Sequence, residues 1–432
     1  MNKIIKISLI SCLILSVSYA EEVKEDRDRL PSVRKAIDSF GKIEEKEVST
    51  VDKFKGMFTD GKVSGQIRSV YAGYDRKIGF NDYATAIGGQ LKYELASFNG
   101  FNAGFAAVTS QDINFATGSN DKHNPELSSA LGDYTELSEA YINYKYEGLN
   151  LRIGRQTLDT PLADSDDIRM VPNTFEAYMA TYEFSNFVFT AGNVQKWQGV
   201  DAGLGHDDAG NRLDSNWINT GDNGTWLGGV TYSDAVDFNA WYYDIDNDID
   251  RVKATYLDFG TGYEFSKDLI LHANIQYLNE GAVDNSNVEA DIYGALVELE
   301  AYDVGFNVAY NYSVGKAGKT SFSGIGGGTM YTSMDTMIID EITEDRDAQA
   351  IVAGVIYQVD NFAFLYAYGD FSGDANSAGE KAHIVEQDIG FEYNVNDEFV
   401  VAAIYVIEED KESSVKTEND WNRAQIMVKY DF

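Results

Sequence analysis

The residues best able to do chemistry in this chain are basic side chains that alternate with apolar ones. Arg68 lies between Ile67 and Ser69, and alternate side chains of an extended segment point to opposite faces. Paired side by side, three such segments near the two chain ends would carry a basic stripe that attracts anions. Arg152, between Leu151 and Ile153, would belong to a separate wall. The predicted stripe consists of Arg68, Lys92, Arg423 and Lys429.

An acidic stretch over residues 157–173 could oppose that stripe. Carboxylates that face arginines across a water-filled space would create a transverse field. Two plainer alternatives stay open: the arginines pair with neighbouring carboxylates such as Glu94, or the acidic stretch is a solvated loop. Two prolines stiffen this stretch, whose charged residues are Asp159, Asp164, Asp166, Asp167 and Arg169. Residues predicted to line the passage are Arg68, Lys92, Arg152, Arg169, Arg423, Lys429, Asp164, Asp166 and Asp167.

No other grouping predicts a reaction, a cofactor or a metal. The chain has no Gly-x-Ser-x-Gly motif, and its 4 histidines are too scattered for a zinc motif. One aspartate-rich hairpin offers calcium-like oxygen ligands but lacks the glycine and distal glutamate of an EF-hand, so a solvated tip is favoured. The ligand candidates in that hairpin are Asp244, Asp246, Asn247, Asp248 and Asp250.

Residues 1–20 are typical of a signal peptide. Lys3 and Lys6 precede an apolar run that is too short to span a membrane, and a small-x-small cleavage site ends at Ala20. Lipoprotein processing at Cys12 is disfavoured, because it would leave apolar residues on the product. Cleavage after Ala20 removes the only cysteine, which excludes disulfides and thiolate sites, and takes the formal charge from −36 to −38 through loss of two lysines. Such an acidic chain is unsuited to bind nucleic acid.

The remainder of the chain reads as β-strands. Residues 83–96 illustrate the period of two, with Ile87, Leu91 and Tyr93 on one face against Gln90 on the other. No other stretch approaches the roughly 18 apolar residues of a membrane helix, so a membrane location requires a closed barrel. The 18 predicted strands are 62–74, 83–96, 101–110, 136–147, 149–156, 174–184, 187–195, 224–233, 237–245, 251–266, 269–280, 289–300, 303–312, 348–359, 361–372, 384–395, 398–409 and 421–432.

The connections between these strands alternate in length. Tight turns follow the even-numbered strands, while generally longer loops such as 157–173 and 313–347 follow the odd-numbered ones. Short turns on one rim and long loops on the other are typical of outer-membrane barrels, and 18 strands leave room for an aqueous channel. The last strand ends on Phe432, as the final strand of such barrels does; an edge strand of a soluble sandwich is the alternative.

The chain resembles a known family over most of residues 52–432. Residues 62–74, 137–156, 168–175 (IRMVPNTF), 324–340 (GIGGGTMYTSMDTMIID) and the closing strand look like the OprD-like family of bacterial outer-membrane porins. This resemblance implies an all-β fold, namely an 18-stranded antiparallel transmembrane β-barrel. It also implies short periplasmic turns, long extracellular loops, and a long loop folded into the lumen. Members pass small solutes, in some cases amino acids or carboxylates.

Residues 21–60 are a longer charged segment than the resemblance leads us to expect. Leu30, Val33, Ile37 and Phe40 follow heptad spacing, which predicts an acidic, partly helical periplasmic segment. A coiled coil below a homotrimer and a tail with a short helix at the barrel mouth are both compatible with it. The predicted organisation is a signal peptide at 1–20, this segment at 21–60 and the barrel at 61–432.

The sequence as a whole predicts an outer-membrane porin. It would pass small hydrophilic solutes and ions by diffusion, contact outer-membrane lipid, and need neither cofactor nor turnover. The alternatives are a barrel enzyme of the lipase or protease type and a surface adhesin that uses the acidic loops.

Overall fold

The fold is formed by one helix and a series of long antiparallel strands. The computed structural model describes residues 50–129, 131–206, 212–246, 251–322 and 324–432. The long strands are β1 (Lys62–Arg76), β2 (Asp82–Glu94), β3 (Phe101–Asp112), β4 (Tyr134–Tyr146), β5 (Leu149–Gln156), β8 (Thr174–Phe184), β9 (Phe187–Gln198), β11 (Thr225–Ser233), β12 (Asp237–Asp246), β13 (Arg251–Ser266), β14 (Leu269–Ala282), β15 (Ala290–Ala301), β16 (Val304–Val314), β17 (Ala348–Val359), β18 (Phe362–Gly373), β19 (Ala382–Asn394), β20 (Phe399–Asp410) and β21 (Trp421–Asp431).

The remaining elements are short. They are the helix α2 (Thr50–Thr59), the strands β6 (Asp159–Thr160), β7 (Ala163–Asp164) and β10 (Ile218–Asn219), and the 3₁₀ turns η2 (Asn120–Lys122), η3 (Pro125–Leu127), η4 (Gly203–Gly205) and η5 (Ile339–Ile342). No helix in the described part of the chain is long and apolar enough to cross a membrane.

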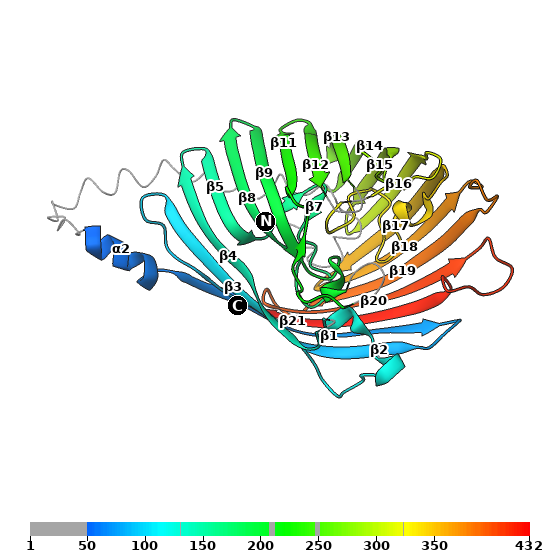
Figure 1. Cartoon of the computed structure of the whole chain (residues 1–432), viewed down its shortest axis with the longest axis horizontal. Coiled ribbons are helices and arrows are strands. Elements are labelled where there is room, and N and C mark those ends of the chain that lie inside the picture. The colour runs from blue at the N-terminus through cyan, green and yellow to red at the C-terminus, as the bar shows by residue number, and fades with distance from the viewer. Residues whose placement is uncertain (1–49, 130, 207–211, 247–250, 323) are drawn as a thin grey trace.

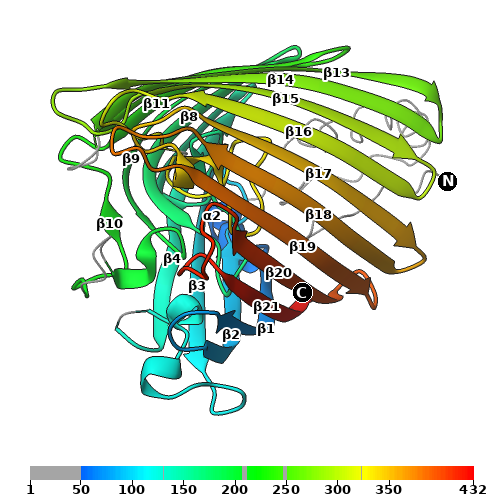
Figure 2. The same ribbon diagram turned by 90° about the vertical axis from the view of Figure 1, so that its right-hand side faces the viewer.

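The long strands close into a barrel. Each pairs antiparallel with its neighbours, and β1 pairs both with β2 and with the last strand, β21, where Arg68 lies opposite Lys429. Figures 1 and 2 show the resulting tilted wall. The predicted 18-stranded antiparallel barrel is therefore confirmed, and each long strand agrees with its predicted range to within about three residues.

The two faces of the wall differ as the period of two predicts. Ile67, Leu91 and Ile142 point outward and are 53%, 56% and 63% exposed, whereas Arg68 and Asn143, one residue along, are buried inside. Closing the sheet pairs all strand backbone groups, which is what a bilayer requires of a strand. Aromatic rings gather near the ends of the outer face, for example Tyr263 and Phe265 with ring centroids 4.7 Å apart.

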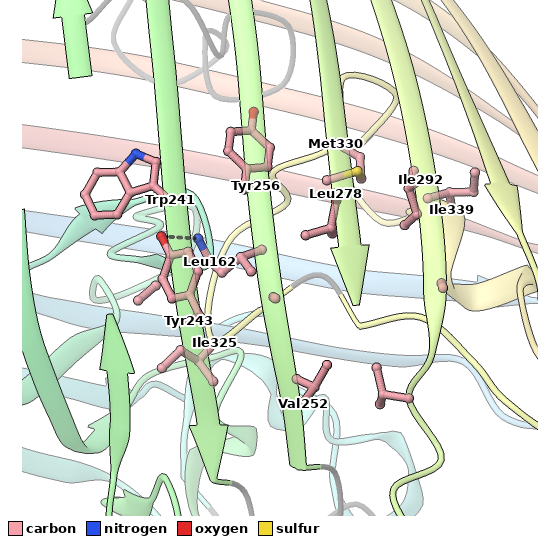
Figure 3. Close-up of a cluster of buried hydrophobic side chains, with 14 of the residues drawn as sticks. Leu162, Trp241, Tyr243, Val252, Tyr256, Leu278, Ile292, Ile325, Met330 and Ile339 are labelled. Atoms are coloured by element: carbon pink, nitrogen blue, oxygen red, sulfur yellow. Dashed lines mark hydrogen bonds between the residues drawn. The ribbon is translucent and has the colours of Figure 1, made fainter. Parts of the chain in front are cut away.

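One part of the inner wall is apolar, which the sequence analysis did not anticipate. Inward side chains of β12 to β15, including Trp241, Tyr243 and Leu278, pack against residues of two loops that fold into the barrel. Figure 3 shows Leu162 of the 157–173 loop and Ile325 and Met330 of the 315–347 loop in this cluster. Part of the lumen is thus filled by packed loops. The predicted strand 237–245 has apolar residues on both faces, and this pattern could have indicated the apolar part of the inner wall.

Candidate constriction inside the barrel

The 157–173 loop crosses the inside of the barrel. Near its start, the backbone N–H of Leu162 donates to the Tyr243 hydroxyl of β12 at 3.2 Å. Near its end, the backbone carbonyl of Arg169 accepts from Arg68 of β1 at 2.6 Å. Among the long strands β12 is the ninth counted from β1, so these two contacts lie on opposite walls of the 18-stranded barrel.

Contacts within the loop and with a second loop fix its conformation. The strands β6 and β7 form a small hairpin, and the Ser165 hydroxyl accepts from the N–H of Leu158 at 2.9 Å. The loop is also joined to the 315–347 loop, since Ala163 and Ile325 form a parallel bridge and the N–H of Ile325 donates to the carbonyl of Leu162 at 2.9 Å. Backbone contacts therefore join two loops that are far apart in the sequence.

Arg68 is fully buried and is held by this loop. Its Nη1 and Nη2 donate to the two carboxylate oxygens of Asp167 at 2.9 and 2.8 Å, and Gln66 accepts a further hydrogen bond from Nη2. Such a bidentate pair fixes geometry as well as charge. The Asp167 side chain is 37% exposed, so its carboxylate remains within reach of water.

Arg423 and Arg169 form the second half of the cluster. Arg423 donates to Asp335 at 2.6 Å and to Glu126 at 3.1 Å, while Arg169 lies 3.9 and 3.6 Å from the same two carboxylates. Burial alone would raise the pKa of Glu126, but the two guanidinium groups lower it to about 2. Three loops, 113–133, 157–173 and 315–347, thus meet on the wall formed by β1 and β21.

Arg68 and Arg423 each have a donor that is not used. Their Nε–H groups are buried and have no hydrogen-bond partner among the described residues, whereas Arg169 Nε lies 3.6 Å from a carboxylate oxygen of Glu126. A buried donor without a partner is costly, so these groups favour any oxygen ligand that reaches them. The cluster therefore has three cations, three carboxylates and unused donors. We call these six residues the arginine cluster: Arg68, Arg169, Arg423, Glu126, Asp167 and Asp335.

The other carboxylates of the loop lie in a different environment. Burial, followed by the charge of Asp159, raises the pKa of Asp164 to about 7, and burial together with Asp201 raises the pKa of Asp166 to about 7. Neither forms an ion pair within the described residues. Asp201 also accepts a hydrogen bond from Asn173 at 2.5 Å, which places it beside the end of the loop. We call Asp164, Asp166 and Asp201 the acidic patch.

The other predicted cations do not join the arginine cluster. Lys92 pairs with Glu139 of β4 at 2.8 Å, and Lys429 pairs with Asp431 at 3.0 Å. Arg152 lies over the Tyr141 ring at 4.4 Å. Of the predicted stripe, Arg68 and Arg423 thus belong to the arginine cluster, whereas Lys92 and Lys429 form separate ion pairs. The carboxylates that hold the two arginines come from distant loops and not from Glu94.

Several residues of the constriction were missed by the sequence analysis. Glu126 and Asp335 lie 297 and 88 positions from their partner Arg423, and no local pattern connects them. Glu386 and Asp388 of β19 were also missed: Glu386 accepts from the N–H of Thr336 at 3.2 Å, and Asp388 from the N–H of Asp335 at 3.3 Å. Alternate acidic residues on an inward face were the only signal for this pair.

The described residues contain no group of three or more His, Cys, Asp or Glu side chains arranged to hold a metal ion. In the candidate calcium hairpin, Asp246 pairs with Arg251 at 2.6 Å. Residues 247–250, which include three of the candidate ligands, lie outside the described residues.

A closed barrel with an apolar outer face and charged loops folded into its interior defines an outer-membrane channel. The chain matches the OprD family of outer membrane porins over residues 55–432, and it belongs to that family. It is thus a porin of the outer membrane that passes small hydrophilic solutes, with the short turns in the periplasm and the long loops outside. Comparison with the curated proteins gives no match.

Solved structures agree with this fold. OccAB2 of Acinetobacter baumannii is 18% identical, with a TM-score of 0.71 over 87% of this chain and 99% of that one. OpdK of Pseudomonas aeruginosa, solved with vanillate, is 15% identical with a TM-score of 0.70 at the same two coverages. OpdL of Pseudomonas aeruginosa is 15% identical with a TM-score of 0.68, again over 87% and 99%.

Proposed function

We propose that this porin favours small solutes that carry a carboxylate, and that such a solute exchanges with Asp167 on Arg68. The observation that carries the proposal is the buried Nε–H group of Arg68, and likewise that of Arg423, which have no hydrogen-bond partner among the described residues. Asp167 is the carboxylate of the arginine cluster most open to water, so it is the one that a solute in the lumen would reach first.

Exchange of one carboxylate for another keeps the energetic cost low. Removing the partner of a buried arginine leaves an uncompensated charge, which costs about 3–5 kcal/mol. An incoming carboxylate replaces the lost charge and hydrogen bonds, whereas a neutral solute replaces neither. When Asp164 and Asp166 are ionised, the acidic patch repels the same solute, which directs its carboxylate toward the arginines.

The solved structure with vanillate suggests a probe, because vanillate is an aromatic carboxylate. Its aldehyde, vanillin, is uncharged in mildly acidic solution, where its phenol stays protonated, so the two are compared there. We would measure the reduction of single-channel potassium chloride current by each compound in planar bilayers. The wild-type channel should respond to vanillate at concentrations about tenfold or more below those needed for vanillin, since one charged hydrogen bond contributes about 1.5–3 kcal/mol.

Two substitutions at the same ion pair have opposite expected effects. Arg68→Ala should reduce the difference between vanillate and vanillin, because the bidentate partner is lost. Asp167→Asn should increase it, because the internal competitor loses its charge while its size is kept. Equal responses of the wild type to both compounds, or an unchanged response in both variants, would show that Arg68 does not select carboxylates.

The proposal includes no chemical turnover, in keeping with the function of the family. The homotrimer also stays a prediction, and the mass of the purified detergent complex would test it. A monomer would leave the carboxylate preference intact, because the arginine cluster consists of residues of one chain.

A further inference from the structure

The helix α2 lies outside the barrel at its periplasmic rim. Figure 1 shows it beyond the end of β1. The N–H of Ala96 donates to the backbone carbonyl of Met57 at 3.0 Å, and the Tyr93 hydroxyl donates to the carbonyl of Phe58. Tyr93 shares the outward face of β2 with Leu91, which is 56% exposed. The helix therefore docks against the lipid-facing side of the wall and not against the lumen.

One face of α2 is apolar and uncovered. Val51, Phe54 and Phe58 have the spacing i, i+3 and i+7, which places them on the same side of a helix. They are 61%, 51% and 54% exposed, although Met57 beside them is buried against the barrel. Large apolar side chains gathered on a surface indicate a binding partner.

This face continues the aromatic girdle of the barrel. The ring of Phe54 lies 5.9 Å from that of Phe98, which belongs to the short turn between β2 and β3. Directly after this turn, Phe101 is 50% exposed and its ring lies 4.6 Å from that of Tyr144. Outward aromatic rings at the ends of barrel strands mark the level of the lipid headgroups. The helix thus lies at the height where a bilayer begins.

The charge of the segment also suits a phospholipid surface. Residues 50–62 contain Lys53, Lys55 and Lys62 against Asp52 and Asp60, a net charge of +1 in a chain of net charge −36. Lysines beside an apolar helix face can reach lipid phosphates while the apolar side chains enter the acyl boundary.

We propose that α2 is an interfacial helix that inserts Val51, Phe54 and Phe58 into the periplasmic leaflet of the outer membrane. The other possible occupants of this face are a second copy of the chain and the aqueous periplasm. The contacts with Tyr93 and Phe98 favour lipid, since both residues belong to the membrane-facing surface. The helix then anchors the start of the barrel outside the conduction path.

Spin labels on single cysteines can distinguish these environments. Cys12 is the only cysteine, so a Cys12→Ser background accepts labels at Phe54→Cys, Phe58→Cys and, independently, Val51→Cys. The full chain would be folded into phospholipid vesicles, and collisions of each label with oxygen and with a water-soluble nickel complex would be compared. At all three positions, oxygen collisions should exceed nickel collisions several-fold.

Two matched positions calibrate the result. Leu91→Cys reports the lipid-facing wall, and Thr59→Cys reports an exposed polar position of the same helix, about 100° of rotation past Phe58, where nickel collisions should dominate. Labels at Phe54 and Phe58 that behave like the label at Thr59 would place this face in water and overturn the proposal. Dipolar broadening between labels would assign the face to a second copy and would also overturn it. Loss of all three labelled apolar side chains should leave single-channel conductance unchanged, which separates this proposal from that on carboxylate preference.

Discussion

Asp166 and Asp167 are consecutive residues of one loop, yet they belong to opposite electrostatic environments. Asp167 is held bidentately by Arg68, whereas Asp166 is buried beside Asp201 and Asp164, and its pKa is raised to about 7. The loop therefore carries a carboxylate that is paired with an arginine and, one residue before it, a carboxylate that forms no ion pair within the described residues.

The difference shows how a highly acidic chain can keep a constriction whose local charge is close to zero. At the arginine cluster, three carboxylates balance three cations, so the local charge is near zero. At Asp164 and Asp166, burial raises the pKa to about 7 and favours the protonated form, so these two side chains carry little negative charge well below pH 7. The field across the constriction thus depends on pH through Asp164 and Asp166, and on fixed ion pairs at the arginine cluster.

Among the substitutions considered, Arg423→Met should have the largest effect on the structure of the constriction. The substitution leaves Glu126 and Asp335 without their main partner, and loss of one member of a buried ion pair costs about 3–5 kcal/mol. We expect the 113–133 and 315–347 loops to detach from β21, which should increase open-channel noise and make both loops sensitive to protease. The measurements are single-channel recording and limited proteolysis of intact cells.

Arg423→Lys serves as the control for Arg423→Met, because it keeps the charge but cannot contact both carboxylates in the same way. It should give an intermediate phenotype. If Arg423→Met cells show wild-type protease resistance and noise, the cluster does not hold the loops.

The second largest expected effect is that of pH on ion selectivity. Because the pKa of Asp164 and of Asp166 is about 7, raising the pH from about 5.5 to 8.5 should add up to two negative charges to the constriction. The cation-to-anion permeability ratio should therefore rise with pH by roughly fivefold, from about 1 kcal/mol of added interaction. Reversal potentials in a salt gradient measure this, and the double variant Asp164→Asn, Asp166→Asn should abolish the step.

Single variants at Asp166 and Asp167 test whether the two consecutive carboxylates differ in charge at the same pH. At pH 5.5, Asp166→Asn should leave the reversal potential unchanged, because Asp166 is already protonated. Asp167→Asn should shift it toward anion permeability at the same pH, since Arg68 loses its counter-charge. Equal shifts for both variants at pH 5.5 would mean that the two carboxylates share one environment.

The sequence predicted the wall far better than the constriction, for a physical reason. Lipid on one side and water on the other impose the period of two on every strand. The residue types of Ile67 and Arg68 therefore suffice to assign each to its face of the wall. The loops had no such constraint. The pairing of Arg423 with Glu126 and Asp335 depends on how three loops fold into the barrel, which no spacing encodes. Connection lengths predicted loops at 157–173 and 313–347, but only the resemblance to a family predicted that a long loop folds into the lumen.

The smallest expected effect concerns Lys429, which the sequence placed in the same stripe as Arg68. In the structure its partner is Asp431, whose side chain is 43% exposed, and such pairs contribute about 0–1 kcal/mol. Lys429→Met should therefore leave protease resistance and noise unchanged and shift the reversal potential only slightly at low salt. The shift should vanish near molar salt, where screening acts within about 3 Å. A shift as large as that of Arg68→Ala would show that the four cations act as one stripe after all, and would place the selective region along the whole wall instead of at the arginine cluster.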